Sequence, residues 1–158
     1  MVNANCCFIR ESFFLKHLEY QKMLDLGDAL KQSRRTYIYV LVNIDDNRFY
    51  LPLRSNLGQD VRLFGRIGHA VPSKKRPNAG IDYRYALIVN DTAYIEPHTS
   101  QKIPEMQYKI IEKDYDAICR EFETYLRKYK RTAKKGRIER EPLFRESSLI
   151  NFHKELGI

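Results

Sequence analysis

The sequence predicts an α+β domain built on a twisted, mainly antiparallel β-sheet. The middle of the chain is rich in β-branched and aromatic runs that are separated by turn residues. One segment with helical spacing of apolar residues precedes this strand-rich region, and two such segments follow it. Strands gathered in the middle of a chain, with helices before and after them, indicate helices packed on one sheet.

Length and composition indicate a single folded domain that spans residues 1–158. Hydrophobic residues make up 43% and charged residues 30% of the chain, with only 7 Gly and 6 Pro, which favours a folded protein over a disordered one. No apolar run approaches the ~18 to 20 residues of a membrane span, and no signal-peptide pattern opens the chain. We therefore expect a cytoplasmic protein without a membrane partner.

The charge balance points to a polyanion as a partner. Lys and Arg total 28 against 20 Asp and Glu, which gives a net charge of +8. Such a charge attracts nucleic acid over a long range, although many basic proteins bind none. Charge alone therefore favours nucleic-acid binding without establishing it.

The sequence offers no motif for a metal or a cofactor. The three cysteines, Cys6, Cys7 and Cys119, are odd in number, and none belongs to a C-x-x-C motif paired with histidines. We interpret them as reduced structural thiols. H-E-x-x-H, G-x-S-x-G and P-loop motifs are also missing from the sequence. We expect no metal site and no cofactor.

The first predicted elements are a short strand and a helix. The apolar run from Cys6 to Ile9 can add one strand to a sheet. From Glu11 onward, apolar residues recur at helical spacing, with Ser12 as a possible N-cap. Gly27 ends this pattern, so the prediction is one helix between Glu11 and Gly27.

A β-hairpin is the central predicted element. Thr36 to Ile44 forms one apolar run and Arg48 to Leu53 the other, with turn residues at Asp45 to Asn47 between them. Because proline cannot donate to a ladder, we expect the second strand to stop at Pro52. Leu53 to Asn56 would then leave the sheet, with polar side chains directed into a cleft.

Further strands and a long basic loop follow the hairpin. Val61 to Ile67 alternates like a half-buried strand, and Ile81 to Val89 with Ala93 to Glu96 predicts a second hairpin. Between them, Gly and Pro residues indicate a loop that carries His69 and the cluster Lys74 to Arg76. This cluster fits either a solvated turn or a nucleic-acid contact.

Two helices are predicted in the last third of the chain. The first begins at Pro104 and Glu105 and has acidic residues before basic ones, which complements the helix dipole. The basic run from Lys130 to Arg140 follows it, as a solvated arm or as a phosphate contact. Ser147 and Ser148 then offer an N-cap for a short helix from Leu149 to Leu156.

Arg35, Arg54 and Ser55 are the candidates for phosphate chemistry. RNA can be cleaved without a metal or a protein nucleophile, because its 2′-hydroxyl attacks the neighbouring phosphorus when cations stabilise the charge that develops. Arginine suits this task because its planar fork binds phosphate oxygens and stays charged. We expect Ser55 to hydrogen-bond RNA, since no His or Lys base lies beside it in sequence. The alternative is an edge hairpin with a solvated Arg and turn-forming Ser and Asn.

Three segments resemble a known family. They read "LPLRSN" (Leu51 to Asn56), "GIDYRYALIV" (Gly80 to Val89) and "SSLINFHKELGI" (Ser147 to Ile158). In order and spacing they are similar to the ribonuclease toxins of type III toxin–antitoxin systems, the ToxN/AbiQ superfamily, and most similar to its TenpN branch. The resemblance extends from Phe13 onward and implies a core like the MazF/CcdB toxin barrel, with added helices.

The resemblance also implies site residues. The family has a basic residue that leads the strand, which matches Arg35, and a Thr/Ser pair that matches Arg54 and Ser55, so that Arg54 stands where most members have Thr. A family Lys falls on Leu57 and a family Tyr falls near Phe14, so the proton shuttles must differ. Possible substitutes are His69, Lys74 and His153. Expected RNA contacts are Tyr37, Asn56, Lys74, Lys75, Arg76, Lys130, Arg131, Lys134, Lys135 and Arg137.

The function that the resemblance implies is a sequence-preferring, metal-independent endoribonuclease toxin. It would leave 2′,3′-cyclic phosphate and 5′-hydroxyl ends on cellular or phage RNA. A small repeat RNA antitoxin, processed by the toxin itself, would neutralise it within an RNA–protein assembly. The alternatives are a non-catalytic RNA-binding module and a DNA-binding regulator.

Overall fold

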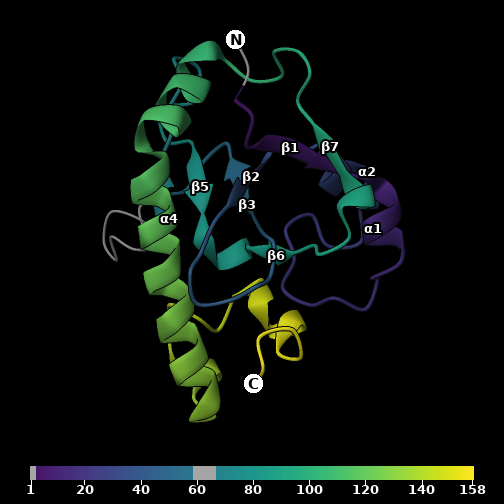
Figure 1. Cartoon of the computed structure of the whole chain (residues 1–158), viewed down its shortest axis with the longest axis vertical. Helices are drawn as coiled ribbons and strands as arrows, with labels where there is room; N and C mark the ends of the chain where they lie inside the picture. The colour runs from purple at the N-terminus through teal and green to yellow at the C-terminus, as the bar shows by residue number, and fades with distance from the viewer. Residues whose placement is uncertain (1–2, 59–66) are drawn as a thin grey trace.

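The computed structural model describes residues 3–58 and 67–158, and its strands form one antiparallel sheet (Figure 1). The strands are β1 (Cys6–Ile9), β2 (Tyr37–Val40), β3 (Phe49–Arg54), β4 (Gly68–Ala70), β5 (Gly80–Asp82), β6 (Leu87–Ile88) and β7 (Ile95–Pro97). Their order is β4-β5-β3-β2-β1-β7, and β6 also pairs with β3. Within the described residues this path ends at β4 and β7. The α+β class is confirmed, whereas the sheet is open and does not close into a barrel.

The central hairpin is confirmed, but its second strand does not stop at Pro52. Pro52 lies opposite Tyr37, and the strand continues until Arg54 pairs with Gly80 of β5. Because the Leu53 N–H donates to the Thr36 carbonyl at 2.9 Å, the Pro52 nitrogen points to the other side of β3. There the 3₁₀ turn η1 (Tyr83–Tyr85) separates β5 from β6. The proline therefore interrupts no ladder.

The predicted N-terminal strand is confirmed as β1, but the predicted helix is wrong. Only α1 (Glu11–Leu15) and α2 (Ala29–Ser33) are helical, and Ser12 caps neither of them. Lys22 and Asp25 both have φ of 54°, a left-handed conformation that a right-handed helix cannot contain. Phe13 and Phe14 of this region are buried, whereas Leu15, Leu18 and Leu26 are exposed.

The second predicted hairpin is also wrong. The Asp82 side chain accepts a hydrogen bond from the Arg84 N–H and caps η1, which breaks the expected strand into β5 and β6. β7 then crosses to the far side of the sheet and pairs with β1. The long loop contains β4, which carries His69. Of the strand expected from Val61 to Ile67, all but Ile67 lies outside the described residues.

The long helix α4 (Glu105–Lys134) is confirmed and lies along one side of the sheet (Figure 1). Its apolar stripe faces the core, where the rings of Phe122 and Phe49 meet edge to face at 5.2 Å. The chain then passes through η3 (Ile138–Arg140) to η4 (Ser148–Phe152), a 3₁₀ segment where an α-helix was expected. Ser147 caps η4 as predicted. None of the described helices combines the length and apolarity needed to cross a membrane.

Candidate functional site

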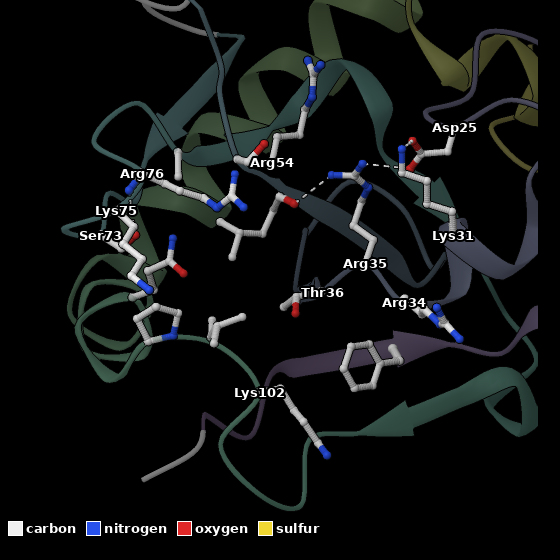
Figure 2. Close-up of a pocket in the computed structure, with 17 residues that line it drawn as sticks. Asp25, Lys31, Arg34, Arg35, Thr36, Arg54, Ser73, Lys75, Arg76 and Lys102 are labelled. Carbon is white, nitrogen blue, oxygen red and sulfur yellow. Dashed lines mark hydrogen bonds and ion pairs between the residues drawn. The ribbon is translucent and has the colours of Figure 1, made fainter.

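A cavity of about 520 Å³ lies at the end of β3, bordered by α2, the loop after β4 and the start of α4 (Figure 2). Among the described residues its wall holds seven basic side chains and a single carboxylate, Asp25. The basic residues are Lys31, Arg34, Arg35, Arg54, Lys75, Arg76 and Lys102. The arrangement therefore favours an anionic ligand.

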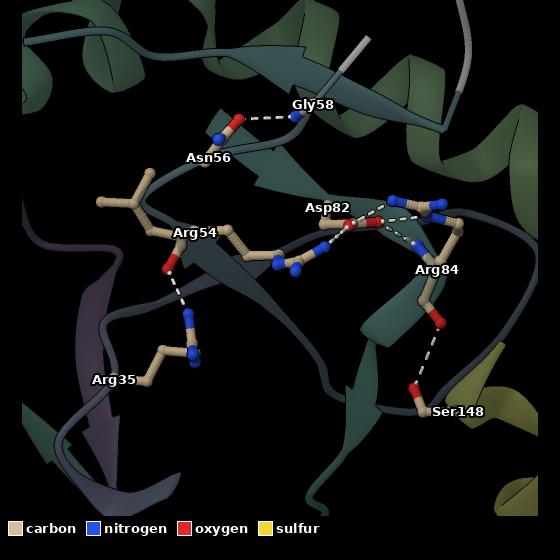
Figure 3. Close-up of polar contacts among 8 residues, drawn as sticks. Arg35, Arg54, Asn56, Gly58, Asp82, Arg84 and Ser148 are labelled. Atoms are coloured by element: carbon tan, nitrogen blue, oxygen red, sulfur yellow. Dashed lines mark hydrogen bonds and ion pairs between the residues drawn. The ribbon is translucent and has the colours of Figure 1, made fainter. Parts of the chain in front are cut away.

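Arg35 is held in the cavity by two oxygens. Its Nη2 donates to Asp25 Oδ2 at 2.8 Å and its Nη1 to the Leu53 carbonyl at 3.1 Å (Figures 2 and 3). Lys31 Nζ lies 3.3 Å from Asp25 Oδ1. Burial acts to raise the pKa of Asp25, but Arg35 and Lys31 outweigh it and hold the pKa below its ordinary value. Asp25 thus remains ionised and fixes the guanidinium of Arg35.

Arg54 borders the cavity, but its guanidinium is held by a different carboxylate. Its Nη1 donates to Asp82 Oδ2 at 2.9 Å, and its Cζ lies 5.4 Å from the centre of the Tyr85 ring. Asp82 is fully buried and also binds Arg84 through Nε at 3.0 Å and Nη2 at 2.9 Å (Figure 3). Arg54 and Arg35 therefore both line the cavity, but each guanidinium is held by a different carboxylate.

Ser55 is an exposed residue on the cavity wall, and its hydroxyl has no hydrogen-bond partner in the described part of the chain. The neighbouring Asn56 lies off the wall, where its Oδ1 accepts the Gly58 N–H at 2.7 Å in a local turn. The structure therefore brings Ser55 to the cavity and gives Asn56 a structural contact.

The loop after β4 contributes two of its three clustered cations. Lys75 and Arg76 line the cavity, and the buried Ser73 fixes the turn by accepting the Arg76 N–H at 3.2 Å. Lys74 is exposed and does not line the cavity. The expectation that Lys74 shuttles a proton is therefore not supported by the geometry, because its neighbours, and not Lys74 itself, border the cavity.

His69 and His153 also lie outside the cavity. His69 Nδ1 is 3.1 Å from Glu121 Oε1 and His69 Nε2 is 2.9 Å from Asp114 Oδ2, so both ring nitrogens bind carboxylates of α4. His153 Nε2 bonds the hydroxyl of Tyr129 at 2.7 Å. Tyr129 is 22 residues along α4 from Gln107 on the cavity wall, a distance of about 33 Å. The geometry does not support either histidine as a proton shuttle.

The predicted RNA contacts fall into two groups, and Tyr37, Asn56 and Lys74 belong to neither. Tyr37 is only 3% exposed and packs in the core, so its side chain cannot reach RNA. Lys75 and Arg76 belong to the cavity, whereas the five from Lys130 onward lie near the C-terminal end of α4. Of these, Lys130 contacts Asp45 Oδ2 at 3.4 Å. The remaining ones are exposed, and we call them the helix-end cations: Arg131, Lys134, Lys135 and Arg137.

Several cavity residues were missed by sequence reasoning. Asp25 lies within the helix that the sequence predicted up to Gly27, and Lys31 lies just beyond it in α2. A carboxylate and several cations so near Arg35 in sequence were a usable signal. Arg34 directly precedes Arg35 and could have been found by adjacency. Lys102 lies in the irregular segment before α4, where the sequence gives no signal for it.

Comparison of the sequence with family models and with curated proteins gives no match. The structure, however, is similar to AbiQ, a lactococcal anti-phage endoribonuclease belonging to the type III toxin–antitoxin system. The TM-score is 0.61 at 15% identity, and the match covers 79% of this chain and 81% of AbiQ.

A second similar structure comes from work on bacterial type III toxin–antitoxin systems, in which a non-coding RNA pseudoknot selectively inhibits the toxin. Here the TM-score is 0.55 at 14% identity, and the match covers 77% of each chain. The protein therefore has the fold of the type III toxin–antitoxin endoribonucleases. The family resemblance seen in the sequence is thus confirmed for the fold, which this protein shares with AbiQ.

Proposed function

We propose that this protein is a metal-independent, sequence-preferring endoribonuclease toxin of a type III toxin–antitoxin system. The observation that carries the proposal is the cavity at the end of β3. Of the residues that the structure describes, seven cations there surround one carboxylate, which is already paired with Arg35 and Lys31. The shared fold supports RNA as the anion, since both similar structures concern type III systems.

The proposed reaction needs only the RNA, the cavity and solvent water. The 2′-hydroxyl gives its proton to water as its oxygen attacks the adjacent phosphorus, the bond to the 5′-oxygen breaks, and the 5′-oxygen takes up a proton. The products are a 2′,3′-cyclic phosphate and a 5′-hydroxyl. Arg35 and Arg76 stabilise the charge on the phosphate oxygens, and Ser55 hydrogen-bonds the 2′-hydroxyl or a phosphate oxygen. The ammonium groups of Lys75 and Lys102 are the proton donors to the departing 5′-oxygen.

Arg54 has a supporting role in this reaction. In the described residues, Asp82 engages Nη1 of Arg54, which leaves Nη2 as a donor to a phosphate oxygen. Asp82 is itself fixed by Arg84, so Arg54 is held in one position at the cavity edge.

The proposed inhibitor is a repeat RNA that the toxin processes. One end of this RNA occupies the cavity and its body reaches the helix-end cations. Lys134 is 27 residues along α4 from Gln107, so the RNA spans about 40 Å. Such an RNA both blocks the cavity and bridges neighbouring copies into an assembly. The pseudoknot inhibitor of the second similar structure supports an RNA in this role.

The test is digestion of single-stranded RNA by the purified protein in excess EDTA, followed by analysis of the product ends. We expect cleavage that leaves 2′,3′-cyclic phosphates and 5′-hydroxyls. Products with 5′-phosphates, or activity that returns only with Mg²⁺, would contradict the mechanism. Tight RNA binding without cleavage would instead establish the non-catalytic RNA-binding module, and preferential binding of duplex DNA would establish the regulator.

A further inference from the structure

A second cavity of about 510 Å³ adjoins the first. The two cavities share Phe8 and Arg34, and the second extends over β1 toward β7. Its other charged residues are Arg10, Glu11 and Glu96. The described surface therefore has a groove that continues past the cation-rich cavity.

The strand register explains why the groove is continuous. The Thr36 carbonyl accepts the Leu53 N–H, so these two residues are neighbours across β3 and β2. Cys7 pairs with Tyr37, which places Phe8 beside Thr36. On its other side Phe8 lies directly opposite Glu96. Directly opposite residues point to the same face of a sheet, so these four side chains form one row across β3, β2, β1 and β7. Three strand spacings of ~4.8 Å give this row a length of about 14 Å.

The two cavities differ in chemistry. Among described residues, the first holds seven cations around one paired carboxylate, whereas the second balances Arg10 and Arg34 against Glu11 and Glu96. A balanced cavity attracts a phosphate less than the first cavity does. It suits a polar, uncharged group.

The boundary between the cavities is aromatic. Phe8 is half-buried, and its ring lies 4.5 Å from the ring of His98. Burial, assisted by Lys102, lowers the pKa of His98 to about 4, so this histidine is neutral at physiological pH. Tyr108 contacts His98 Nδ1 at 2.8 Å and holds the ring behind Phe8. The ring of Phe8 is therefore held in place by His98 and lies beside the carboxylate of Glu96 on the same face of the sheet.

We propose that the second cavity holds one unpaired base of the RNA whose phosphate lies in the first cavity, an inference that rests on the proposed function. The base stacks on Phe8, and Arg34 at the boundary binds its phosphate. Glu96 accepts hydrogen bonds from the Watson–Crick edge. A carboxylate only accepts hydrogen bonds, and adenine, cytosine and guanine each carry an exocyclic amino group that can donate to it. The one donor of uracil, N3–H, lies between two carbonyl oxygens that repel a carboxylate, so this site favours adenine, cytosine or guanine over uracil.

The contact between Glu96 and Arg10 does not prevent this role. The two groups are 3.5 Å apart, and their side chains are 55% and 51% exposed. Exposed ion pairs of this kind are weak and exchange partners readily. Binding of a base therefore replaces a labile contact.

Glu96→Gln tests the selectivity. Glutamine has the shape of glutamate but donates as well as accepts, so uracil becomes acceptable. We expect the wild-type protein, given a pool of random single-stranded RNA, to disfavour uracil roughly tenfold or more at one position near the cut. Glu96→Gln should lose this discrimination at that position alone. Glu105→Gln is the matched control, because Glu105 is an exposed carboxylate in a surface ion pair with Lys109 outside both cavities.

Phe8→Leu tests the stacking surface. Leucine keeps an apolar side chain but removes the ring, so affinity for a short RNA should fall roughly tenfold while the rate at saturating RNA stays near wild type. A merely structural role of Phe8 would lower the thermal midpoint instead and leave the affinity of the folded protein unchanged.

The outcomes separate this inference from the proposed function. If the wild type cleaves RNA and Glu96→Gln keeps the same base preference, the second cavity does not read a base although the toxin assignment stands. If the wild type cleaves no RNA, the proposed function fails, and affinities for four homopolymeric oligonucleotides then replace the cleavage profile. An unchanged ranking of those affinities in Glu96→Gln overturns the inference.

Discussion

The two ends of α4 are both basic, but they are built differently. At the N-terminal end, cations from separate segments, such as Arg35, Arg54 and Lys75, surround a cavity with Asp25 among them. At the C-terminal end, the helix-end cations come from one continuous run and are exposed. A run of charge in a sequence therefore marks an exposed surface, whereas an enclosed anion site is assembled by the fold from scattered residues.

The difference has an energetic consequence. Cations gathered in a cavity repel one another, and paired carboxylates such as Asp25 and Asp82 offset that repulsion and fix their geometry. Exposed cations are screened by salt and remain mobile. We therefore expect substitutions in the cavity to change chemistry and substitutions at the helix end to change salt-dependent affinity.

The largest expected effect is that of Ser55→Ala. This change removes one exposed hydroxyl that has no partner among the described residues, so folding should persist. Loss of a hydrogen bond to the reacting groups should reduce the cleavage rate by roughly 1000-fold and relieve growth inhibition, while RNA binding remains. Initial rates on single-stranded RNA measure it, with Ser100→Ala, an exposed serine away from the cavity, as the control. A fully toxic Ser55→Ala protein would show that the site is misplaced.

Much of the cavity was predictable from local sequence, but its assembly was not. Arg35 and Ser55 flank a hairpin whose strands have a clear apolar pattern, and that pattern places both residues near the same strand ends. The prediction for Pro52 was wrong because its missing N–H faces the gap between β5 and β6, which only the tertiary pairing reveals. The position of Asp25 in the cavity could not be predicted, because the local spacing of apolar residues gives no sign of the left-handed φ that this residue adopts.

Arg54→Lys should have the next largest effect. Lysine keeps the charge but loses the planar fork, whose separate nitrogens let Arg54 bind Asp82 through one and a phosphate oxygen through another. Because Asp82 is fully buried, its remaining partner Arg84 must then carry the charge alone. We expect a roughly 100-fold lower cleavage rate, measured as for Ser55→Ala. Arg120→Lys, on the exposed face of α4, is the control. Unchanged activity would restrict Arg54 to a structural role.

A direct comparison of the two basic regions comes from paired double variants. Lys134→Ala with Lys135→Ala should weaken binding of the repeat RNA and reduce the slope of log affinity against log salt by about 1.4, with cleavage of a short substrate unchanged. Lys75→Ala with Arg76→Ala should impair both binding and cleavage. Affinities measured over a salt series give the slopes. If the helix-end pair leaves the affinity and the slope unchanged, the antitoxin binds elsewhere.

The smallest expected effect concerns His69 and His153, the two histidines that lie outside the cavity. Burial lowers the pKa of His69, but Asp114 and Glu121 outweigh burial, so the pKa in the folded state is raised above 6.5. The charged His69 therefore stabilises the fold below about pH 6.5, and this contribution is lost as pH rises through the raised folded value. The pH dependence of the His153 contribution to stability has the opposite sign. Burial lowers the pKa of His153, so its protonation at low pH opposes folding.

The loss of unfolding free energy in variants of these two histidines should therefore change with pH in opposite directions. His69→Gln should lose about 1 kcal/mol or less of unfolding free energy at pH 5.5 and less at pH 9, because the Asp114 and Glu121 partners are partly exposed. His153→Gln should lose relatively more stability at the higher pH. Urea unfolding at both values measures this, with cleavage assayed at neutral pH. His69→Gln could instead keep its stability at every pH but cleave RNA as poorly as Ser55→Ala. That result would make His69 a proton shuttle, and its contacts with Asp114 and Glu121 would then belong to the chemistry as well as to the fold.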